Sequence, residues 1–385
     1  MNVPFKSADI YVKLIFPPLL VGLLFLPLTG IAHALRLSAA TLACLVLWRL
    51  FTIDAISSSA RTLLRHWAPR TEGMSSLIRT VNTPLAYVVW IVFLILLPLL
   101  LNDYYRDIMT LTGMYIVLAL GLNIVVGQAG LLNLGYVAFY AVGAYTYAVF
   151  STTAGLAFWP GLLAGAAASA PFALLVGLPT LRLRGDYFAI VTLGLGEITR
   201  IILNNADSIT GGPNGIAKIG RPVIAGYTLH RTLDYYYLIL LIAIVTIFAV
   251  KRLMTSRIGR AWIAIREDEV AAEAMGINTF SLKLLAFVVG SALAGLVGVF
   301  FAAKMAFVSP ESFTFFESVL ILCMVVLGGM GSIPGIILGA LLLITLPEVF
   351  RDFQDFRMLA FGIALVAMMV FRPQGLLGTV KTKFR

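Results

Sequence analysis

Residues 251–283 read KRLMTSRIGRAWIAIREDEVAAEAMGINTFSLK, and the rest of the chain is organised around this stretch. It holds ten charged residues, in a protein whose residues are only 12% charged. A long apolar run ends just before it at Val250, and another begins just after it at Leu284. Residues 251–283 therefore form a charged segment between two apolar segments, placed to contact a soluble partner on one side of a membrane.

The chain as a whole has the composition of a membrane protein. Of its 385 residues 60% are hydrophobic, and its mean hydropathy is +0.98. A soluble domain is nearer half apolar and a quarter charged. The apolar runs are continuous, not alternating, and approach the roughly 20 residues that a spanning helix needs. We predict an all-α, polytopic integral membrane helix bundle of about ten to twelve spans, at residues 14–32, 35–53, 84–101, 109–126, 134–150, 156–179, 187–203, 235–250, 284–303, 317–329, 333–347 and 357–371.

The net charge of +10 is unevenly placed along these predicted spans. With the N-terminus inside and all spans crossing, 19 of the 28 basic residues fall on the inner side. This positive-inside bias predicts that both termini, the 55–83 loop and residues 251–283 are cytoplasmic. Basic loops beside spans contact anionic membrane lipid. No basic patch with interleaved aromatic residues is present, so we expect no nucleic-acid partner.

The chain divides into three parts by composition. The N-terminal part resembles a cleavable signal, with Ala32-His33-Ala34 after an apolar run, but a second run follows directly and favours an uncleaved hairpin. The 204–234 loop is the longest predicted outer segment, with turn chemistry at residues 210–215; it either docks a partner or only connects two spans. We predict a two-span appendage with a cytoplasmic loop at 1–83, one transmembrane domain at 84–375, and a basic cytoplasmic tail at 376–385.

Glycine clusters interrupt two of the hydrophobic regions, at residues 127–135 and 328–335. Paired interruptions in the two halves of a membrane protein indicate an inverted repeat with a central substrate pathway, because broken helices expose backbone dipoles. The alternative is two ordinary loops with helix caps, since the two segments do not align residue for residue. Polar residues in or near the spans are pathway candidates or packing hydrogen-bond partners: Asn123, Gln128, Asn133, Thr192, Glu197 and Ser332.

Within the charged segment, the pattern predicts a turn at 257–260 and then a short amphipathic helix. Asp268 and its acidic neighbours offer a cap and first-turn negative charge, and Gly276 offers a stop. Val270, Ala271, Ala274 and Met275 share one face of this helix. An acidic, alanine-rich helix favours a groove on a partner protein over the lipid surface, where basic and bulky residues are expected.

Several kinds of chemistry have no signature in this sequence. There is no Gly-x-x-x-x-Gly-Lys-Ser/Thr loop and no His-Glu-x-x-His, so we expect neither ATP hydrolysis by this chain nor metalloprotease chemistry. Cys44 and Cys323 lie in apolar runs, and the three histidines are scattered. We therefore expect no catalytic residues, metal or cofactor.

Three blocks of the sequence together resemble a known family. The run 109–147, the stretch 182–215 with its Arg-Leu-Arg-Gly-Asp-Tyr-Phe start and Gly-Gly-Pro-Asn-Gly loop, and the loop 256–281 look like LivM-type permease subunits of branched-chain amino acid ABC transporters. The resemblance covers about 84–375. It implies a bacterial inner-membrane importer of leucine, isoleucine and valine. Its partners would be a second, LivH-like permease subunit, two cytoplasmic ATPase subunits that bind the ATP, and a periplasmic binding protein.

The charged segment then resembles the coupling segment of ABC importers, usually Glu-Ala-Ala-x-x-x-Gly. Ala271, Ala272 and Gly276 fit this spacing, but Val270 occupies the Glu position and Glu269 lies one residue early. We expect ATP-driven movement of a 260–276 helix, with coupling lost when Ala272 or Gly276 is made bulky. The alternatives are a related permease for urea, amides or other amino acids, and an ion-gradient-driven carrier. The coupling candidates are Gly259, Arg260, Arg266, Glu267, Asp268, Glu269, Ala271, Ala272 and Gly276.

Overall fold

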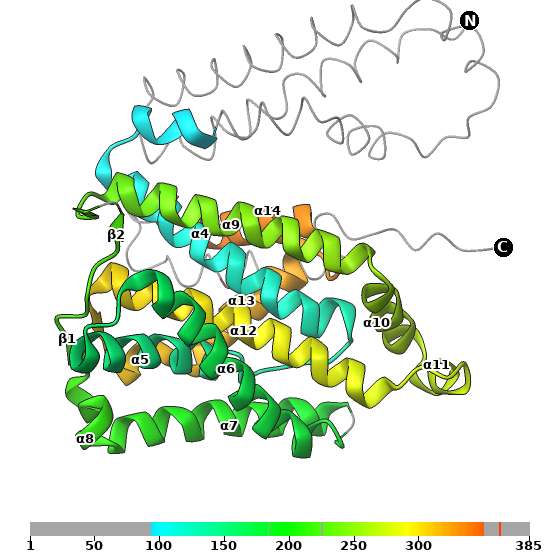
Figure 1. Cartoon of the computed structure of the whole chain (residues 1–385). Coiled ribbons are helices and arrows are strands. Elements are labelled where there is room, and N and C mark those ends of the chain that lie inside the picture. The colour runs from blue at the N-terminus through cyan, green and yellow to red at the C-terminus, as the bar shows by residue number, and fades with distance from the viewer. Residues whose placement is uncertain (1–93, 184, 225, 350–361, 363–385) are drawn as a thin grey trace, which may run out of the picture. The chain divides into compact units, whose positions relative to one another are not determined.

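The computed structural model describes residues 94–183, 185–224, 226–349 and 362 (Figure 1). The chain separates into two compact units. The larger comprises Leu101–Ile344 with Leu359–Arg385, and the smaller comprises Met1–Leu100 with Thr345–Met358. In the smaller unit the described part includes a 3-10 turn, η1 (Leu97–Leu100). The functional description below concerns the larger unit.

The described residues from 101 to 349 are built almost entirely of helices. In chain order these are α4 (Asp103–Asn123), the π-helical turn η2 (Ile124–Gln128), α5 (Val137–Ala154), α6 (Phe158–Thr180), α7 (Asp186–Asn205), α8 (Asp207–Thr210), the 3-10 turn η3 (Gly212–Asn214), α9 (Thr232–Thr255), α10 (Arg257–Glu267), α11 (Glu269–Ala274), α12 (Thr279–Met305), the 3-10 turn η4 (Pro310–Phe313), α13 (Phe315–Gly328) and α14 (Ile333–Val349). Four two-residue strands form two small antiparallel pairs: β1 (Ile216–Ala217) with β4 (Phe307–Val308), and β2 (Val223–Ile224) with β3 (Tyr227–Thr228).

The helices confirm the predicted fold class. Among the described residues five helical segments are long and apolar enough to cross a membrane: Asp103–Gln128, Phe158–Thr180, Thr232–Thr255, Thr279–Met305 and Pro310–Gly328. The predicted spans 134–150, 187–203 and 333–347 also coincide with helices, α5, α7 and α14. The predicted spans 14–32 and 35–53 lie outside the described residues, as do most of 84–101 and 357–371. The total of ten to twelve spans therefore stays a prediction.

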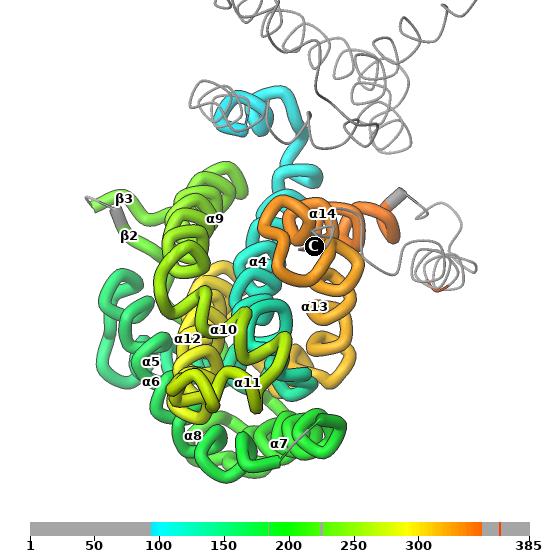
Figure 2. The backbone as a smooth tube through the Cα atoms, turned by 90° about the vertical axis from the view of Figure 1, so that its right-hand side faces the viewer, coloured from blue at the N-terminus to red at the C-terminus, as the bar shows by residue number. Residues whose placement is uncertain are grey.

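The core is centred on α12, which packs against α4, α5 and α6. Figure 2, which looks along the helices, shows α4 and α12 between α5 and α6 on one side and α13 on the other. Glycines allow this close packing: a Cβ on Gly143 would overlap the carbonyl oxygen of Gly295. Gly161 and Gly165 of α6 also serve close packing, because a Cβ on Gly165 would meet Val299 and one on Gly161 would meet the ring of Tyr147.

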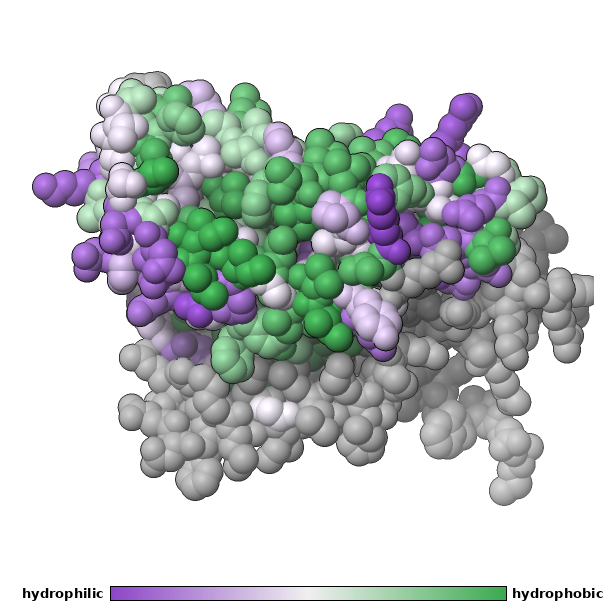
Figure 3. All heavy atoms as spheres, turned by 90° about the horizontal axis from the view of Figure 1, so that it is seen from below, coloured by the Kyte–Doolittle hydropathy of each residue, from purple (hydrophilic) through white to green (hydrophobic). Residues whose placement is uncertain are grey.

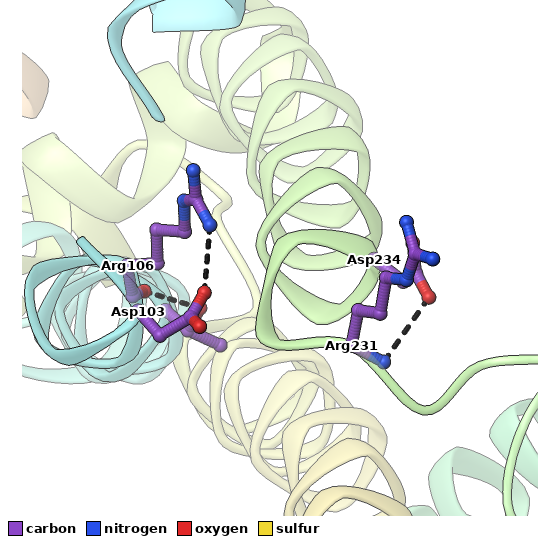
Figure 4. Close-up of polar contacts among 5 residues, drawn as sticks. Asp103, Arg106, Arg231 and Asp234 are labelled. Atoms are coloured by element: carbon purple, nitrogen blue, oxygen red, sulfur yellow. Dashed lines mark hydrogen bonds and ion pairs between the residues drawn. The ribbon is translucent and has the colours of Figure 1, made fainter. Parts of the chain in front are cut away.

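The helices of the larger unit share two ends, which Figure 1 shows on opposite sides. The α11 end carries α10 and α11, and the α8 end carries α8 and the strands. At the α8 end, α4 begins with an ion pair of 2.6 Å between Asp103 and Arg106 (Figure 4). At the start of α9, the backbone N–H of Arg231 donates to Asp234 at 3.2 Å. Charged groups thus lie at the first turns of two spans, as expected where helices meet water.

Candidate functional site

The segment predicted as a turn at 257–260 is instead the first turn of a helix, so that prediction is wrong. The Ser256 side chain caps α10 by accepting from the Gly259 N–H at 3.3 Å. Gly259 is buried where the helix starts against the end of α9, and a Cβ there would meet the carbonyl oxygens of Leu253 and Met254. Close approach, not a turn, explains this glycine. Arg260 is exposed and donates to the carbonyl oxygen of Thr255 at 3.0 Å.

The indole of Trp262 fixes α10 to α12. This side chain is fully buried, and its Nε1 donates to the carbonyl oxygen of Leu282 at 2.7 Å. Ile265, one turn later, is also buried. These contacts hold α10 against the first turns of α12, a helix at the centre of the core.

The short helix α11 has the predicted cap and stop. Asp268 accepts from the Ala271 N–H at 3.0 Å. After the helix, Gly276 has φ +82°, and the Ile277 N–H donates to the carbonyl oxygen of Ala272 at 3.1 Å, a Schellman arrangement. A 260–276 helix was predicted to move with the ATPases. The extended backbone of Asp268 (φ −157°, ψ 108°) divides it into α10 and α11 instead.

The two sides of α11 have different surroundings. On one side Glu269 pairs with Lys283 of α12 at 2.5 Å, and Glu273 accepts from Thr279 at 2.7 Å. Ala272 faces the same way and is only 4% exposed. On the other side Val270 and Met275 are 70% and 82% exposed, and Ala271 and Ala274 are exposed with them. The acidic side therefore attaches α11 to the bundle, and the apolar, small-residue side is presented outward.

The two glycine interruptions, about 200 residues apart in sequence, meet at the α11 end. The Asn123 side-chain oxygen accepts from the Gly331 N–H at 2.8 Å. A Cβ on Gly127 would lie 2.8 Å from the same Gly331 nitrogen, so the two segments touch through their backbones. We call Asn123–Gly130 together with Gly328–Gly335 the glycine junction.

Arg266, the last but one residue of α10, reaches this glycine junction. Its Nη1 donates to the carbonyl oxygen of Gly127, and its Nη2 pairs with Glu267 at 3.0 Å. A Cβ on Gly130 would lie 2.9 Å from the Cγ of Arg266. Sequence reasoning assigned Arg266 to the charged segment but missed this contact, which joins residues 139 positions apart.

The six predicted pathway residues do not gather in one place. Asn123, Gln128 and Ser332 belong to the glycine junction and are buried. Asn133 is buried beside the start of α5, where it accepts from the Gly135 N–H at 3.0 Å. Thr192 of α7 accepts from the Leu134 N–H at 3.2 Å. These hydrogen bonds satisfy the irregular backbone between η2 and α5.

Glu197 lies apart from the other five predicted residues, on the exposed face of α7. It pairs with Arg200 at 2.9 Å, and the two side chains are 32% and 35% exposed. At 1.5 Å per residue, Glu197 is about 16 Å from the start of α7 and about 12 Å from its end. Glu197 therefore lies nearer the middle of α7 than either of its ends. Exposed apolar residues surround the pair, including Ile190, Ile198 and Ile201.

Figure 3 shows the face of the unit that carries α7. Hydrophobic residues fill its middle, and hydrophilic residues gather toward both ends. This pattern matches a surface that spans a bilayer. On α7 itself, Gly194 faces open space, since a Cβ there would meet nothing within 4 Å.

Sequence reasoning also missed a buried polar contact between α4 and α13. The Tyr115 hydroxyl donates to Glu317 at 2.5 Å. Glu317 of α13 thus accepts a hydrogen bond that joins two helices. Within the described part of the chain, no group of three His, Cys, Asp or Glu side chains is placed to hold a metal ion.

Comparison with known proteins gives a consistent picture. The family model described as branched-chain amino acid transport system / permease component matches residues 104–372. The chain is 45% identical over 329 residues to the high-affinity branched-chain amino acid transport system permease protein LivM of Escherichia coli (strain K12), covering 80% of this chain and 77% of the relative.

More distant relatives extend this picture. A probable LivM of Methanocaldococcus jannaschii is 26% identical, covering 52% of this chain and 62% of the relative. The autoinducer 2 import system permease protein LsrC of Yersinia pestis (strain Pestoides F) is 27% identical, covering 57% and 65%. No solved structure matches the chain.

Proposed function

This chain belongs to the family of branched-chain amino acid transport system permease components, and we propose that it carries leucine, isoleucine and valine in an ATP-driven importer. The family assignment and the apolar helices make it a multi-pass membrane permease subunit. In the proposal, two separate ATPase subunits hydrolyse ATP, and a second permease completes the substrate pathway. A binding protein delivers the amino acid.

One observation of the structure supports coupling to separate ATPases. α11 is capped at both ends and tied to α12 through its acidic side, yet its apolar side, with Val270 and Met275, is uncovered. A face of small and apolar residues on a fixed short helix suits insertion into a groove of a partner protein. We propose that this groove lies on an ATPase subunit, so that closure of the ATPases moves α10 and α11 together.

The distribution of basic residues supports an orientation in which the α11 end faces the cytoplasm. Among the described residues, this end carries seven basic side chains and the α8 end five: Lys251, Arg252, Arg257, Arg260, Arg266, Lys283 and Arg182 against Arg106, Lys218, Arg221, Arg231 and Lys304. The excess follows the positive-inside rule. In this orientation both termini are cytoplasmic, and the α8 end faces the binding protein.

The exposed face of α7 supports a proposal for where the second permease packs against this chain. α7 coincides with the predicted span 187–203. An ion pair exposed near the middle of a span is costly against lipid, and such groups face protein or a water-filled cavity. Gly194 also allows another helix to approach closely. We propose that the α7 face around Glu197 and Arg200 lines the pathway shared with the second permease.

The reconstituted importer tests this function. Proteoliposomes that contain both permeases and both ATPases, with the leucine-loaded binding protein outside, are expected to accumulate leucine only with ATP. Leucine uptake driven by a sodium or proton gradient without the ATPases would refute the proposal.

A pair of variants tests α11 specifically. The predicted site Ala272 is buried, so a bulky residue there disrupts packing and does not probe the outer surface. The informative variant is Ala271→Phe, because Ala271 is exposed on the free face. It is expected to abolish stimulation of the ATPases by the loaded binding protein. Ala167→Phe, at an exposed position of the spanning helix α6, is the matched control and is expected to have no effect.

A further inference from the structure

The contacts of Arg266 concern the step between movement of α10 and opening of the substrate pathway. On one side, Arg266 belongs to α10, which the buried Trp262 anchors to α12. On the other side, its guanidinium bonds the Gly127 carbonyl at the end of η2. Gly331, from the second interruption, lies beside it, since a Cβ there would be 3.6 Å from the Arg266 Nη1. One side chain therefore bonds one arm of the glycine junction and lies beside the other.

The glycine junction is also incompletely bonded. Asn123 Nδ2 and Gln128 Oε1 are buried and have no hydrogen-bond partner among the described residues. An unpaired buried polar group costs about 1–3 kcal/mol. The junction also ends α4 in a π-helical turn, a form that occurs frequently at functional sites. Unpaired groups beside a π-turn leave bonds to be gained in a second arrangement, so this region is suited to change shape.

A purely structural role for Arg266 is the simplest alternative. A guanidinium at a helix C-terminus satisfies orphan carbonyls and stabilises the helix end. That role requires only the Gly127 bond. It does not require that the same side chain belong to the segment that contacts a partner, or that it lie against the second interruption.

We propose that Arg266 is the positioning residue that transmits movement of α10 to both glycine interruptions, so that α4 and the α13–α14 connection move together. The proposal rests on the proposed function, since it describes how the α10–α11 segment is linked to the substrate pathway. When α10 moves, its guanidinium displaces the Gly127 carbonyl and, through the Asn123–Gly331 bond, the second arm.

The first test compares Arg266→Met with Arg266→Lys in the complete importer in proteoliposomes. The readout is leucine imported per ATP hydrolysed, with basal ATPase activity measured alongside. Loss of a hydrogen bond from a charged group is expected to lower this ratio about tenfold in Arg266→Met. Arg266→Lys retains a donor and is expected to keep most of the ratio. Arg257→Gln removes an exposed cation of the same helix and is expected to stay within about twofold of the original protein.

A second pair of variants perturbs Arg266 without altering it. Gly130 and Gly155 both follow helical segments with positive φ, +75° and +63°, so alanine strains both backbones similarly. Only at Gly130 does the added Cβ meet Arg266; at Gly155 it meets nothing within 4 Å. Gly130→Ala is therefore expected to lower leucine imported per ATP, and Gly155→Ala is expected to leave it unchanged.

The outcomes separate this proposal from the proposed function. Absence of ATP-dependent leucine uptake by the original complex refutes the proposed function itself. Uptake by the original complex with an unchanged ratio in Arg266→Met refutes only the role of Arg266. If Arg266→Met does not assemble, the glycine pair decides, and equal effects of Gly130→Ala and Gly155→Ala overturn the proposal.

Discussion

The cap of α11 is a sensitive point at which to test whether this helix must be formed for ATPases to bind. Asp268→Ala removes the side-chain acceptor of the Ala271 N–H, a bond of 3.0 Å. Loss of an N-cap costs about 1 kcal/mol, which is about fivefold in the equilibrium between formed and unformed helix. With six residues, α11 is too short to form alone, so it depends on this cap and on its contacts with α12.

If the partner binds only the formed helix, the apparent dissociation constant rises by the same factor, up to about fivefold. Hydrogen exchange over residues 269–275 and titration of the detergent-solubilised permease with ATPase subunits measure the two effects. Asp268→Asn is the matched control, because it keeps a capping oxygen and loses the charge. Equal weakening by Asp268→Asn and Asp268→Ala would show that the charge matters and the cap does not, which contradicts this reasoning.

Three further predictions concern the packing of the bundle and the α7 surface. Gly143→Ala is expected to lower the free energy of unfolding by about 1–3 kcal/mol, because the new Cβ meets Gly295. Gly194→Ala adds a Cβ that meets nothing within 4 Å, and it is expected to raise the stability of α7 slightly. Trp262→Phe is expected to cost about 1 kcal/mol through loss of its hydrogen bond to Leu282, seen as faster exchange in α10. Glu197→Gln is expected to leave the expression level unchanged and to reduce the rate of leucine uptake in proteoliposomes.

The helical architecture follows from the sequence because burial in lipid demands long, continuous apolar runs. The predicted spans in the described region each coincide with a helix, and the resemblance to LivM-type permeases is confirmed. The cap at Asp268 and the stop at Gly276 were also predictable, since both depend on local backbone chemistry.

The tertiary contacts were not predictable from one sequence. From sequence alone, a glycine is assigned to a turn. Only the close approach of the Met254 carbonyl oxygen explains why a glycine is needed at position 259 inside a helix. The bond between Asn123 and Gly331 joins residues 208 positions apart, and no local pattern encodes it. Helical periodicity placed Ala271, but not Ala272, on the face with Val270 and Met275, although which face packs against α12 depends on how α11 docks.

Photo-crosslinking from the exposed face of α11 tests the central claim most directly. A photoreactive residue at Val270, in the complete importer in its native membrane, is expected to capture an ATPase subunit, with yield that changes when ATP is added. The same residue at Leu241, an exposed position on the spanning helix α9, is expected to capture lipid. Capture of lipid alone from Val270 would contradict the claim that α11 is the contact through which separate ATPases drive transport.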